Sequence, residues 1–267
     1  MNQLPKRSLG QVFLNSGAVV ARIVRALQAG PGDAVVEIGP GRGALTSALA
    51  LAGGPLTVIE KDGRLAESLR VRFAEKVRVV EADATTIDLA EATGDPAAAG
   101  LLVVGNLPYN VGTAIVFNVL RQRSRVARIV VMLQREVAHR MAARPGDRDH
   151  GSLSLAAQAR AGVELLFDVA PTKFVPRPDV WSSVVRLVPA VLPHPAAAAV
   201  DAPGFDDLLR ALHAQPRKTV ANSLADGLRV PRAQAERLLA AAGVDPGLRP
   251  AHVTAVQALE VFLASRA

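Results

Sequence analysis

The 267-residue chain contains no cysteine, and this absence excludes several kinds of chemistry. Without thiols the protein can form no disulfide, no thiolate metal site and no iron–sulfur cluster. Methylation at pyrimidine carbon 5 is also excluded, because that mechanism requires a covalent nucleophile. The five histidines are far apart in the sequence and lack the spacing of zinc ligands. We therefore expect no bound metal.

Long apolar runs are also lacking. No window is long and apolar enough to span a bilayer, and the first ten residues are too polar for a signal peptide. We therefore expect a cytoplasmic protein that does not enter a membrane. The formal charge of +7 favours a polyanionic partner such as nucleic acid, although a genome-wide bias towards arginine and alanine has the same effect on charge.

Apolar, β-branched segments alternate with amphipathic helical segments along most of the chain. A helix is predicted between Ser16 and Gly30, and further helices over 64–73, 113–121 and 134–143. Strands are predicted over 34–38, 56–60, 77–81, 101–105 and 128–133. Strands 163–169 and 181–188 are so close in sequence that they must be antiparallel neighbours. The pattern predicts an α/β fold of the class I methyltransferase (Rossmann-like) type, with a mostly parallel sheet that ends in an antiparallel strand pair.

The chain changes character after residue 188. Residues 189–204 are rich in Pro and Ala and are predicted to form a linker. Helices are predicted over 205–213, 217–225, 231–242 and 253–264. The sequence thus predicts a cofactor-binding domain over 1–188 and a small, all-helical RNA-binding domain over 205–267.

A glycine-rich turn follows the first predicted strand of the sheet, in V-E-I-G-P-G-R-G-A (36–44). Gly39 and Gly41 allow the backbone to turn sharply and to approach a ligand closely. Glu60, at the end of the next strand, can accept hydrogen bonds from a ribose diol. This pattern fits both a nicotinamide dinucleotide and S-adenosylmethionine, so by itself it does not decide between them.

Two carboxylates near this turn help to separate the cofactors. Glu37 precedes the glycines, where it would repel a pyrophosphate and attract the ammonium group of S-adenosylmethionine. Asp83, at the end of the third strand, can bind an adenine amino group, although an ordinary loop aspartate is the more common reason for such a residue.

The segment G-N-L-P-Y (105–109) follows the fourth strand, at the carboxyl edge where open α/β sheets bind ligands. Its ordinary interpretation is a turn. In a catalytic interpretation, the side-chain oxygen of Asn106 and the carbonyl of Pro108 accept both N6 hydrogens of an adenine, which makes the nitrogen pyramidal and frees its lone pair. Tyr109 can stack on the base.

With these motifs in this order, the chain resembles the small-subunit (16S-type) rRNA adenine N6-dimethyltransferases, which are related to the erythromycin-resistance rRNA methyltransferases. The resemblance covers nearly the whole chain: G-Q-V-F-L (10–14), V-E-I-G-P-G (36–41), V-I-E-K-D (58–62), E-A-D-A (81–84), N-L-P-Y (106–109), L-Q-R-E-V (133–137), F-V-P-R-P (174–178) and R-K-T-V-A-N-S-L (217–224).

The resemblance implies roles for individual residues. It places Gln11, Val12, Leu14, Glu37, Gly39, Gly41, Glu60, Asp83 and Asn106 around S-adenosylmethionine, and Asn106, Pro108 and Tyr109 around the target adenine. Phe174 would be the second ring that clamps the adenine, or else a core residue. Val12 is a departure, because the family usually has Asn there: backbone contacts survive this change and side-chain amide contacts do not. For Arg217 and Lys218 the ordinary interpretation is a solvated basic face, but the basic charge of the whole chain and a folded RNA substrate favour contacts with the RNA backbone.

The function implied is S-adenosylmethionine-dependent dimethylation of adenine N6, on a pair of adjacent adenines near the 3′ end of 16S rRNA, linked to small-subunit maturation. We expect a monomer whose partner is 16S rRNA or the small-subunit precursor. The main alternative is adenine methylation of large-subunit rRNA, of the antibiotic-resistance type. An NAD-dependent oxidoreductase would leave Asn106–Tyr109, the basic charge and the helical tail without a role, and a purely RNA-binding assembly factor would not need an intact N-L-P-Y segment.

Overall fold

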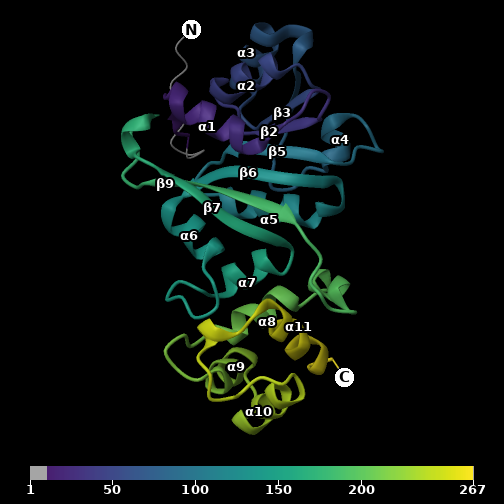
Figure 1. The fold of residues 1–267 in the computed structure, drawn as a ribbon, viewed down its shortest axis with the longest axis vertical. Helices are drawn as coiled ribbons and strands as arrows, with labels where there is room; N and C mark the ends of the chain where they lie inside the picture. Colours follow the sequence, from purple (N-terminus) through teal and green to yellow (C-terminus); the bar gives the residue numbers. More distant parts are fainter. Residues whose placement is uncertain (1–10, 267) are drawn as a thin grey trace. The chain divides into compact units, whose positions relative to one another are not determined.

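The computed structural model describes residues 11–266 (Figure 1). They divide into two compact units: residues 11–138 with 164–189, and residues 139–163 with 190–266. This division differs from the predicted domains, because it groups residues 139–163 with the C-terminal helices. The domain boundaries inferred from the sequence remain a prediction about which parts fold and act together.

A seven-stranded sheet forms the centre of the first unit, in the order β4-β3-β2-β5-β6-β9-β7. The pairs β3–β4, β2–β3, β2–β5 and β5–β6 are parallel, whereas β9 runs antiparallel to β6. Side chains join Asp168 to Ser183 and Glu164 to Arg186, so β7 and β9 also run in opposite directions. The predicted fold class is confirmed. The strands are β2 (Val35–Ile38), β3 (Leu56–Glu60), β4 (Arg78–Glu81), β5 (Leu101–Asn106), β6 (Val126–Gln134), β7 (Ala161–Val169) and β9 (Ser182–Pro189).

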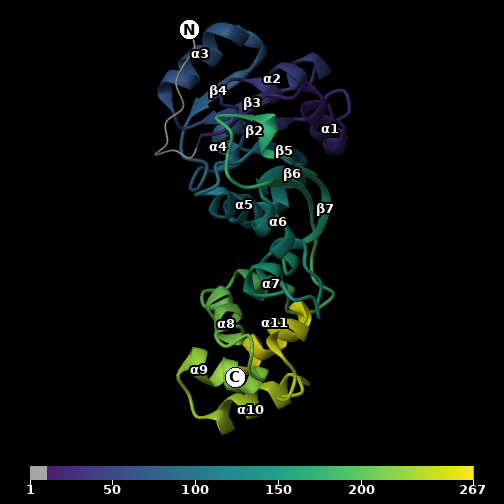
Figure 2. The same ribbon diagram turned by 90° about the vertical axis from the view of Figure 1, so that its left-hand side faces the viewer.

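Helices cover both faces of this sheet, as the continuous burial of the central strands β2, β3 and β5 requires. On one face, apolar side chains of α1 (Gly17–Leu27), α2 (Ala44–Leu49) and α3 (Gly63–Phe73) pack with Val58, Val104 and Val130 in one core. On the other side of the strands lie α4 (Leu89–Thr93) and α5 (Gly112–Arg121) (Figure 2). Short 3-10 helices join the elements: η2 (Ala50–Ala52), η3 (Ala74–Lys76), η4 (Arg123–Arg125) and η5 (Pro171–Lys173).

A second, two-stranded sheet was not anticipated from the sequence. Strand β1 (Phe13–Leu14) pairs antiparallel with β8 (Phe174–Val175), with Phe13 opposite Val175 and Leu14 opposite Phe174. Two-residue strands carry no periodicity that a sequence pattern could reveal. This pairing fixes the segment that precedes α1, which includes three predicted cofactor-binding residues.

The second unit is helical. Its core contains Phe205 and Leu212 of α8, Leu224 of α9 and Phe262 of α11, and the Phe205 and Phe262 rings meet edge to face at 5.4 Å. The guanidinium of Arg160, which is 4% exposed, pairs with Asp201 and Asp206. The C-terminal helices predicted from the sequence are confirmed, with α9 beginning three residues later than expected. The elements are α7 (Ser152–Gln158), η6 (Ala197–Asp201), α8 (Phe205–Leu212), α9 (Val220–Leu228), α10 (Arg232–Ala241), η7 (Pro250–His252) and α11 (Ala255–Ala264); α6 (Arg135–Ala142) begins in the first unit and ends in the second.

Two further features bear on the predictions. The predicted linker, residues 189–204, contains the 3-10 helix η6 and belongs to the second compact unit from residue 190 onwards. Among the described residues, no helix is both long enough and apolar enough to cross a bilayer.

Candidate active site

A cavity opens at the carboxyl ends of β2, β3 and β5, where the sheet topology favours a ligand site. It holds roughly 1120 Å³ of space, its open mouth included. Side chains and backbone from segments that are far apart in the sequence line it. The lining residues include all nine predicted cofactor-binding positions: Gln11, Val12, Leu14, Glu37, Gly39, Gly41, Glu60, Asp83 and Asn106.

The glycine-rich turn holds the buried carboxylate of Glu60 in place. Gly41 has a φ of +57°, and a Cβ added there would lie 2.9 Å from the Phe13 ring, so both conformation and space require glycine. The Gly41 N–H donates to Glu60 Oε2 at 3.1 Å, and the Asp62 N–H donates to Oε1 at 2.9 Å. Burial raises the pKa of Glu60. Each carboxylate oxygen keeps a lone pair for a further donor, such as a ribose hydroxyl.

Glu37 lies in the same cavity and is 1% exposed. Thr46 Oγ1 donates to its Oε2 at 2.7 Å. Burial raises the pKa of Glu37 from 4.5 to about 8, and the neighbouring Glu60 adds to the effect. The carboxyl is therefore mostly protonated at neutral pH, and a cation bound beside it would favour the ionised form.

Asp83, just after the end of β4, is a carboxylate whose pKa is shifted in the opposite direction to that of Glu37. Lys61 Nζ donates to Asp83 Oδ2 at 2.7 Å, and the Thr85 hydroxyl and N–H both donate to Oδ1. These contacts lower the pKa of Asp83 to about 2, so it is ionised at neutral pH. An ionised, half-exposed acceptor of this kind suits an amino group of a base.

Asn106 is the last residue of β5, and the two polar atoms of its side-chain amide differ in their hydrogen bonding. Nδ2 donates to the backbone carbonyl of Val12 at 2.9 Å. Oδ1 is buried and has no hydrogen-bond partner among the described residues. Because Val12 contributes only its backbone carbonyl to this contact, the contact is unaffected by the replacement of the usual Asn at position 12. A buried acceptor without a donor costs on the order of 1–3 kcal/mol, so this oxygen is suited to accept a hydrogen bond from a ligand.

The rest of the N-L-P-Y segment is also held in position. The Pro108 carbonyl accepts a hydrogen bond from the Val111 N–H at 3.2 Å, which leaves one lone pair for another donor. Pro108 lines the cavity, whereas Tyr109 does not. The Tyr109 ring is half-buried, and its hydroxyl lies 2.7 Å from Ser182 Oγ at the start of β9. Burial raises the pKa of Tyr109, so the hydroxyl is neutral at physiological pH.

Phe174 is placed away from the cavity wall. It is 3% exposed and packs in the core cluster with Leu14, Val20 and Val184. The structure therefore places Phe174 where the core alternative expects it. Its role as a second ring against the adenine remains a prediction that requires this side chain to become accessible.

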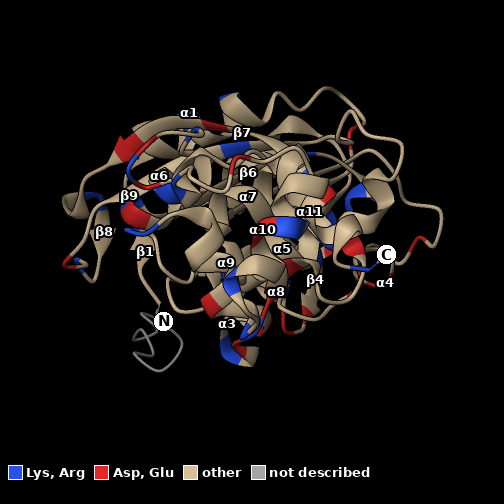
Figure 3. Cartoon of the chain, turned by 90° about the horizontal axis from the view of Figure 1, so that it is seen from below, with Lys and Arg blue, Asp and Glu red and all other residues tan. Residues whose placement is uncertain are grey.

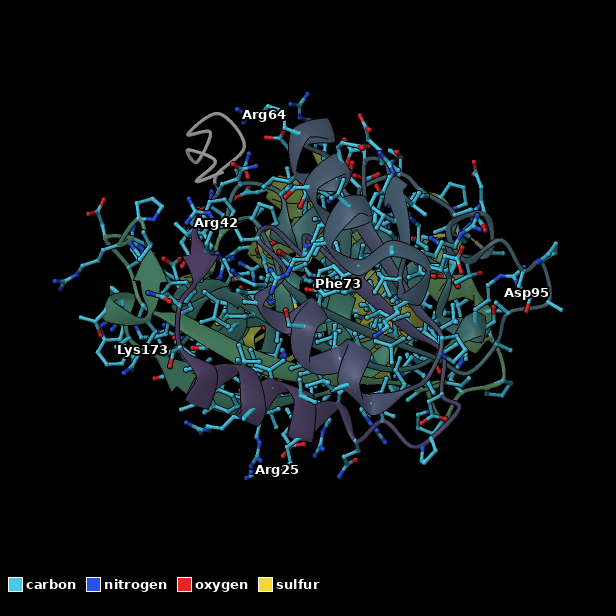
Figure 4. All side chains as sticks on the ribbon, turned by 90° about the horizontal axis from the view of Figure 1, so that it is seen from above. Arg25, Arg42, Arg64, Phe73, Asp95 and Lys173 are labelled. Carbon is cyan, nitrogen blue, oxygen red and sulfur yellow. The ribbon has the colours of Figure 1, made fainter. Side chains whose placement is uncertain are left out.

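Some cavity residues were not singled out individually by sequence reasoning. Phe13 lines the cavity, and the Arg42 guanidinium lies 4.5 Å from the centre of the Phe13 ring (Figure 4 labels Arg42). Lys61 also lines the cavity and was overlooked, although its place directly after Glu60 at a strand end is a usable signal. Phe13 belongs to the Q-V-F-L segment (11–14) that the resemblance places at the cofactor pocket, and its position depends on the pairing of β1 with β8.

Arg217 and Lys218 lie in the second unit, directly before Thr219, the N-cap residue of α9. Both are exposed, and Lys218 Nζ lies 3.6 Å from Asp226 Oδ2. Figure 3 shows basic and acidic segments interspersed along the labelled helices. An acidic side chain therefore lies beside Lys218.

Comparison with known proteins agrees with this geometry. Residues 2–263 match the model of a family described as ribosomal RNA adenine dimethylase. The chain belongs to this family. A relative from Pseudomonas syringae, the ribosomal RNA small subunit methyltransferase A, is 41% identical over 92% of this chain and 88% of its own length. The protein of the same name from Anaeromyxobacter sp. (strain K) is 41% identical over 91% of this chain and 87% of its own length.

Solved structures extend the family likeness to the fold. The 23S rRNA methyltransferase ErmE is 28% identical, with a TM-score of 0.67, and the match covers 96% of this chain and all of that one. A dimethyladenosine transferase from Plasmodium falciparum has a TM-score of 0.77 at 22% identity, over 94% of this chain and 96% of that one. The second likeness concerns the fold alone.

Proposed function

We propose that the protein transfers methyl groups from S-adenosylmethionine to the N6 amines of adenines in 16S rRNA, to give dimethyladenine at a pair of adjacent positions near the 3′ end. The observation that carries this proposal is the buried Oδ1 atom of Asn106, which has no donor among the described residues although its amide orientation is fixed by Val12. An adenine amine supplies such a donor.

The cavity fits the proposed cofactor. Glu60 keeps acceptor capacity for the ribose hydroxyls, and Asp83 offers an ionised acceptor for an adenine amino group. Glu37 is buried where it can become the partner of an ammonium group. A pyrophosphate there would oppose the ionisation of Glu37 and would have no favourable charge interaction with it. When bound, S-adenosylmethionine supplies an electrophilic methyl group.

The protein's own groups would then prepare the adenine nitrogen. The lone pair of N6 is delocalised into the base and is a poor nucleophile. Asn106 Oδ1 and the free lone pair of the Pro108 carbonyl accept the two N6 hydrogens and favour a pyramidal nitrogen. These acceptors bind the pyramidal form more strongly than the planar one, which is the condition for lowering the barrier. Tyr109, fixed by Ser182, provides a ring on which the base stacks.

The choice of small-subunit RNA rests on the relatives. Proteins named ribosomal RNA small subunit methyltransferase A reach 41% identity over most of their length, whereas the 23S rRNA methyltransferase ErmE reaches 28%. The net charge of +7 supports an RNA substrate. We further propose that the protein acts in the cytoplasm as a monomer, on 16S rRNA or the small-subunit precursor.

The experiment is methylation in vitro. Purified protein is incubated with labelled S-adenosylmethionine and with unmethylated 16S rRNA, small subunits or 23S rRNA, and modified adenines are mapped by mass spectrometry. We expect dimethyladenine near the 3′ end of 16S rRNA. Modification confined to 23S rRNA would instead support the antibiotic-resistance type, and no transfer to any RNA would overturn the proposal.

A further inference from the structure

The segment 175–181 exposes an unusual amount of apolar surface. Trp181, the only tryptophan in the chain, is 47% exposed, and Val175 and Val180 are 48% and 43% exposed. We call residues 175–181 the Trp181 loop. A half-exposed indole leaves a large apolar area in water, and clustered exposed apolar side chains are typical of binding surfaces. The loop therefore has the character of a contact region.

Its backbone ties the Trp181 loop to the candidate active site. The Trp181 carbonyl accepts a hydrogen bond from the Arg135 N–H at 2.9 Å, just beyond the end of β6. The next residue, Ser182, lies opposite Gln134 and holds the Tyr109 hydroxyl at 2.7 Å. Trp181 is thus one residue away from the side chain that fixes the proposed stacking ring, at the same edge of the sheet as Asn106.

The chemistry around the loop favours a nucleic acid over an apolar partner. Lys173, at the near end of this region, and Arg177, inside the loop, are exposed, and Asp179 is the one acidic residue between them and Trp181 (Figure 4 labels Lys173). An exposed aromatic ring with neighbouring cations is the combination that binds unpaired RNA, by stacking on bases and by attraction to phosphates.

We propose that Trp181 is a positioning residue that stacks on a nucleotide adjacent to the target adenine. This inference rests on the proposed function. A methyltransferase that extrudes an adenine leaves its neighbours unstacked, and a ring beside the site can replace part of the lost stacking. Trp181 would then set which adenine enters the site, and its loss would weaken RNA binding without changing the cofactor site.

The single tryptophan provides a direct test. Unmethylated 16S rRNA is titrated into the wild-type protein, with S-adenosylhomocysteine in place of the cofactor to prevent turnover. We expect the tryptophan fluorescence to be quenched as the RNA saturates the protein. The control variant, Trp181→Phe combined with Leu51→Trp, carries its only tryptophan at a position where the wild-type side chain is 89% exposed and outside the cavity lining. Its tryptophan emission should not change when RNA is added.

Kinetics give an independent readout. Trp181→Ala should raise the KM for RNA about 10-fold, from the loss of one stacked base, with kcat and cofactor affinity unchanged. Trp181→Phe should restore most of the affinity, which a merely structural role would not require. Leu51→Ala, which removes an apolar side chain that is more exposed than Trp181 and lies outside the cavity lining, should have no effect. Thermal melting of each variant checks that it folds.

The outcomes separate this inference from the proposed function. If the wild-type protein methylates 16S rRNA but Trp181→Ala has a normal KM and the wild-type fluorescence does not respond to RNA, the role of Trp181 is refuted and the proposed function stands. Quenching by small-subunit proteins but not by RNA would also refute it. If the wild-type protein transfers no methyl group, the proposed function itself fails.

Discussion

The cavity at the sheet edge and the helical unit use polar groups in different ways. In the cavity, polar atoms are buried and fixed by backbone partners: Glu60 by the N–H groups of Gly41 and Asp62, and Asn106 by the Val12 carbonyl. In the helical unit, Arg217 and Lys218 are exposed side chains, and Lys218 lies near Asp226. A fixed, buried acceptor interacts strongly with one ligand atom, whereas exposed charges act weakly, additively and through a screening solvent.

This contrast predicts a gradient of mutational effects. Single substitutions in the cavity should change one step by large factors, and substitutions in the helical unit should change RNA binding by small, salt-dependent factors. The experiments below test that gradient from the largest expected effect to the smallest.

Asn106→Ala should have the largest effect. It removes the acceptor that we assign to the N6 hydrogen, whose interaction strengthens in the transition state, so kcat on RNA should fall about 100-fold or more. Affinity for RNA, measured by filter retention, should fall much less. Asn15→Ala, an exposed asparagine in the same unit, is the control and should behave as wild type. Equal losses in turnover and in RNA affinity would make Asn106 a binding residue only.

Glu60→Ala should weaken cofactor binding by about 1.5–3 kcal/mol, because it removes charged hydrogen bonds to the ligand and leaves two N–H groups unpaired. Isothermal calorimetry with S-adenosylmethionine measures this change. Glu81→Ala is a matched control, since Glu81 lies opposite Glu60 on β4 but does not line the cavity. Unchanged affinity in Glu60→Ala would remove Glu60 from the site.

Glu37 should make cofactor binding depend on pH. Its pKa is about 8, and a bound ammonium would lower it, so binding below pH 8 releases a proton and affinity rises with pH by at most about tenfold per unit. Above about pH 8 the dependence should level off. Calorimetry in buffers of different ionisation enthalpy detects the released proton, and Glu37→Gln should release none. Binding by wild type without proton release would show that no cation sits beside Glu37.

The same shift affects stability with a definite sign. The pKa of Glu37 is raised on folding, so its contribution to the free energy of unfolding is fully present below about pH 4.5 and is lost as the pH rises through about 8. Denaturant unfolding of Glu37→Gln should lack this decline.

Sequence reasoning found the parts of the cavity that follow directly from strand ends. Gly39, Gly41, Glu60, Asp83 and Asn106 each end or follow a β-branched segment, and parallel strands bring such ends to one edge of the sheet. The fold class followed from the same alternation of strands and helices, and from the short distance between the last two strands.

The parts that the sequence did not reveal depend on contacts between distant segments. The orientation of the Asn106 amide is set by Val12, 94 residues earlier, and no local pattern encodes it. Phe13 and Phe174 take their places from the pairing of two-residue strands. Helix α7 begins directly after a loop rich in charge and glycine, and its seven residues are too few for a clear amphipathic pattern.

Arg217→Glu combined with Lys218→Glu should have the smallest effect. The first-turn N–H groups of α9 already have partners, among them Leu248 and Pro246 carbonyls and the Thr219 side chain, so phosphates would be bound by these two side chains. Lys218 already interacts with Asp226, and a pair half exposed to solvent contributes little, so the expected loss of RNA affinity is modest.

Salt dependence distinguishes a phosphate contact from a general change in charge. Each lost contact should reduce the slope of log affinity against log salt by on the order of one. Arg25→Glu with Lys76→Glu is the matched control: it reverses two exposed charges in the first unit, so both double variants go from +7 to +3, since each reversal changes the charge by two (Figure 4 labels Arg25). If the two double variants lose RNA affinity and slope equally, only net charge matters, and Arg217 and Lys218 are not RNA contacts. Cofactor affinity should be unchanged in both, because none of these residues lines the cavity.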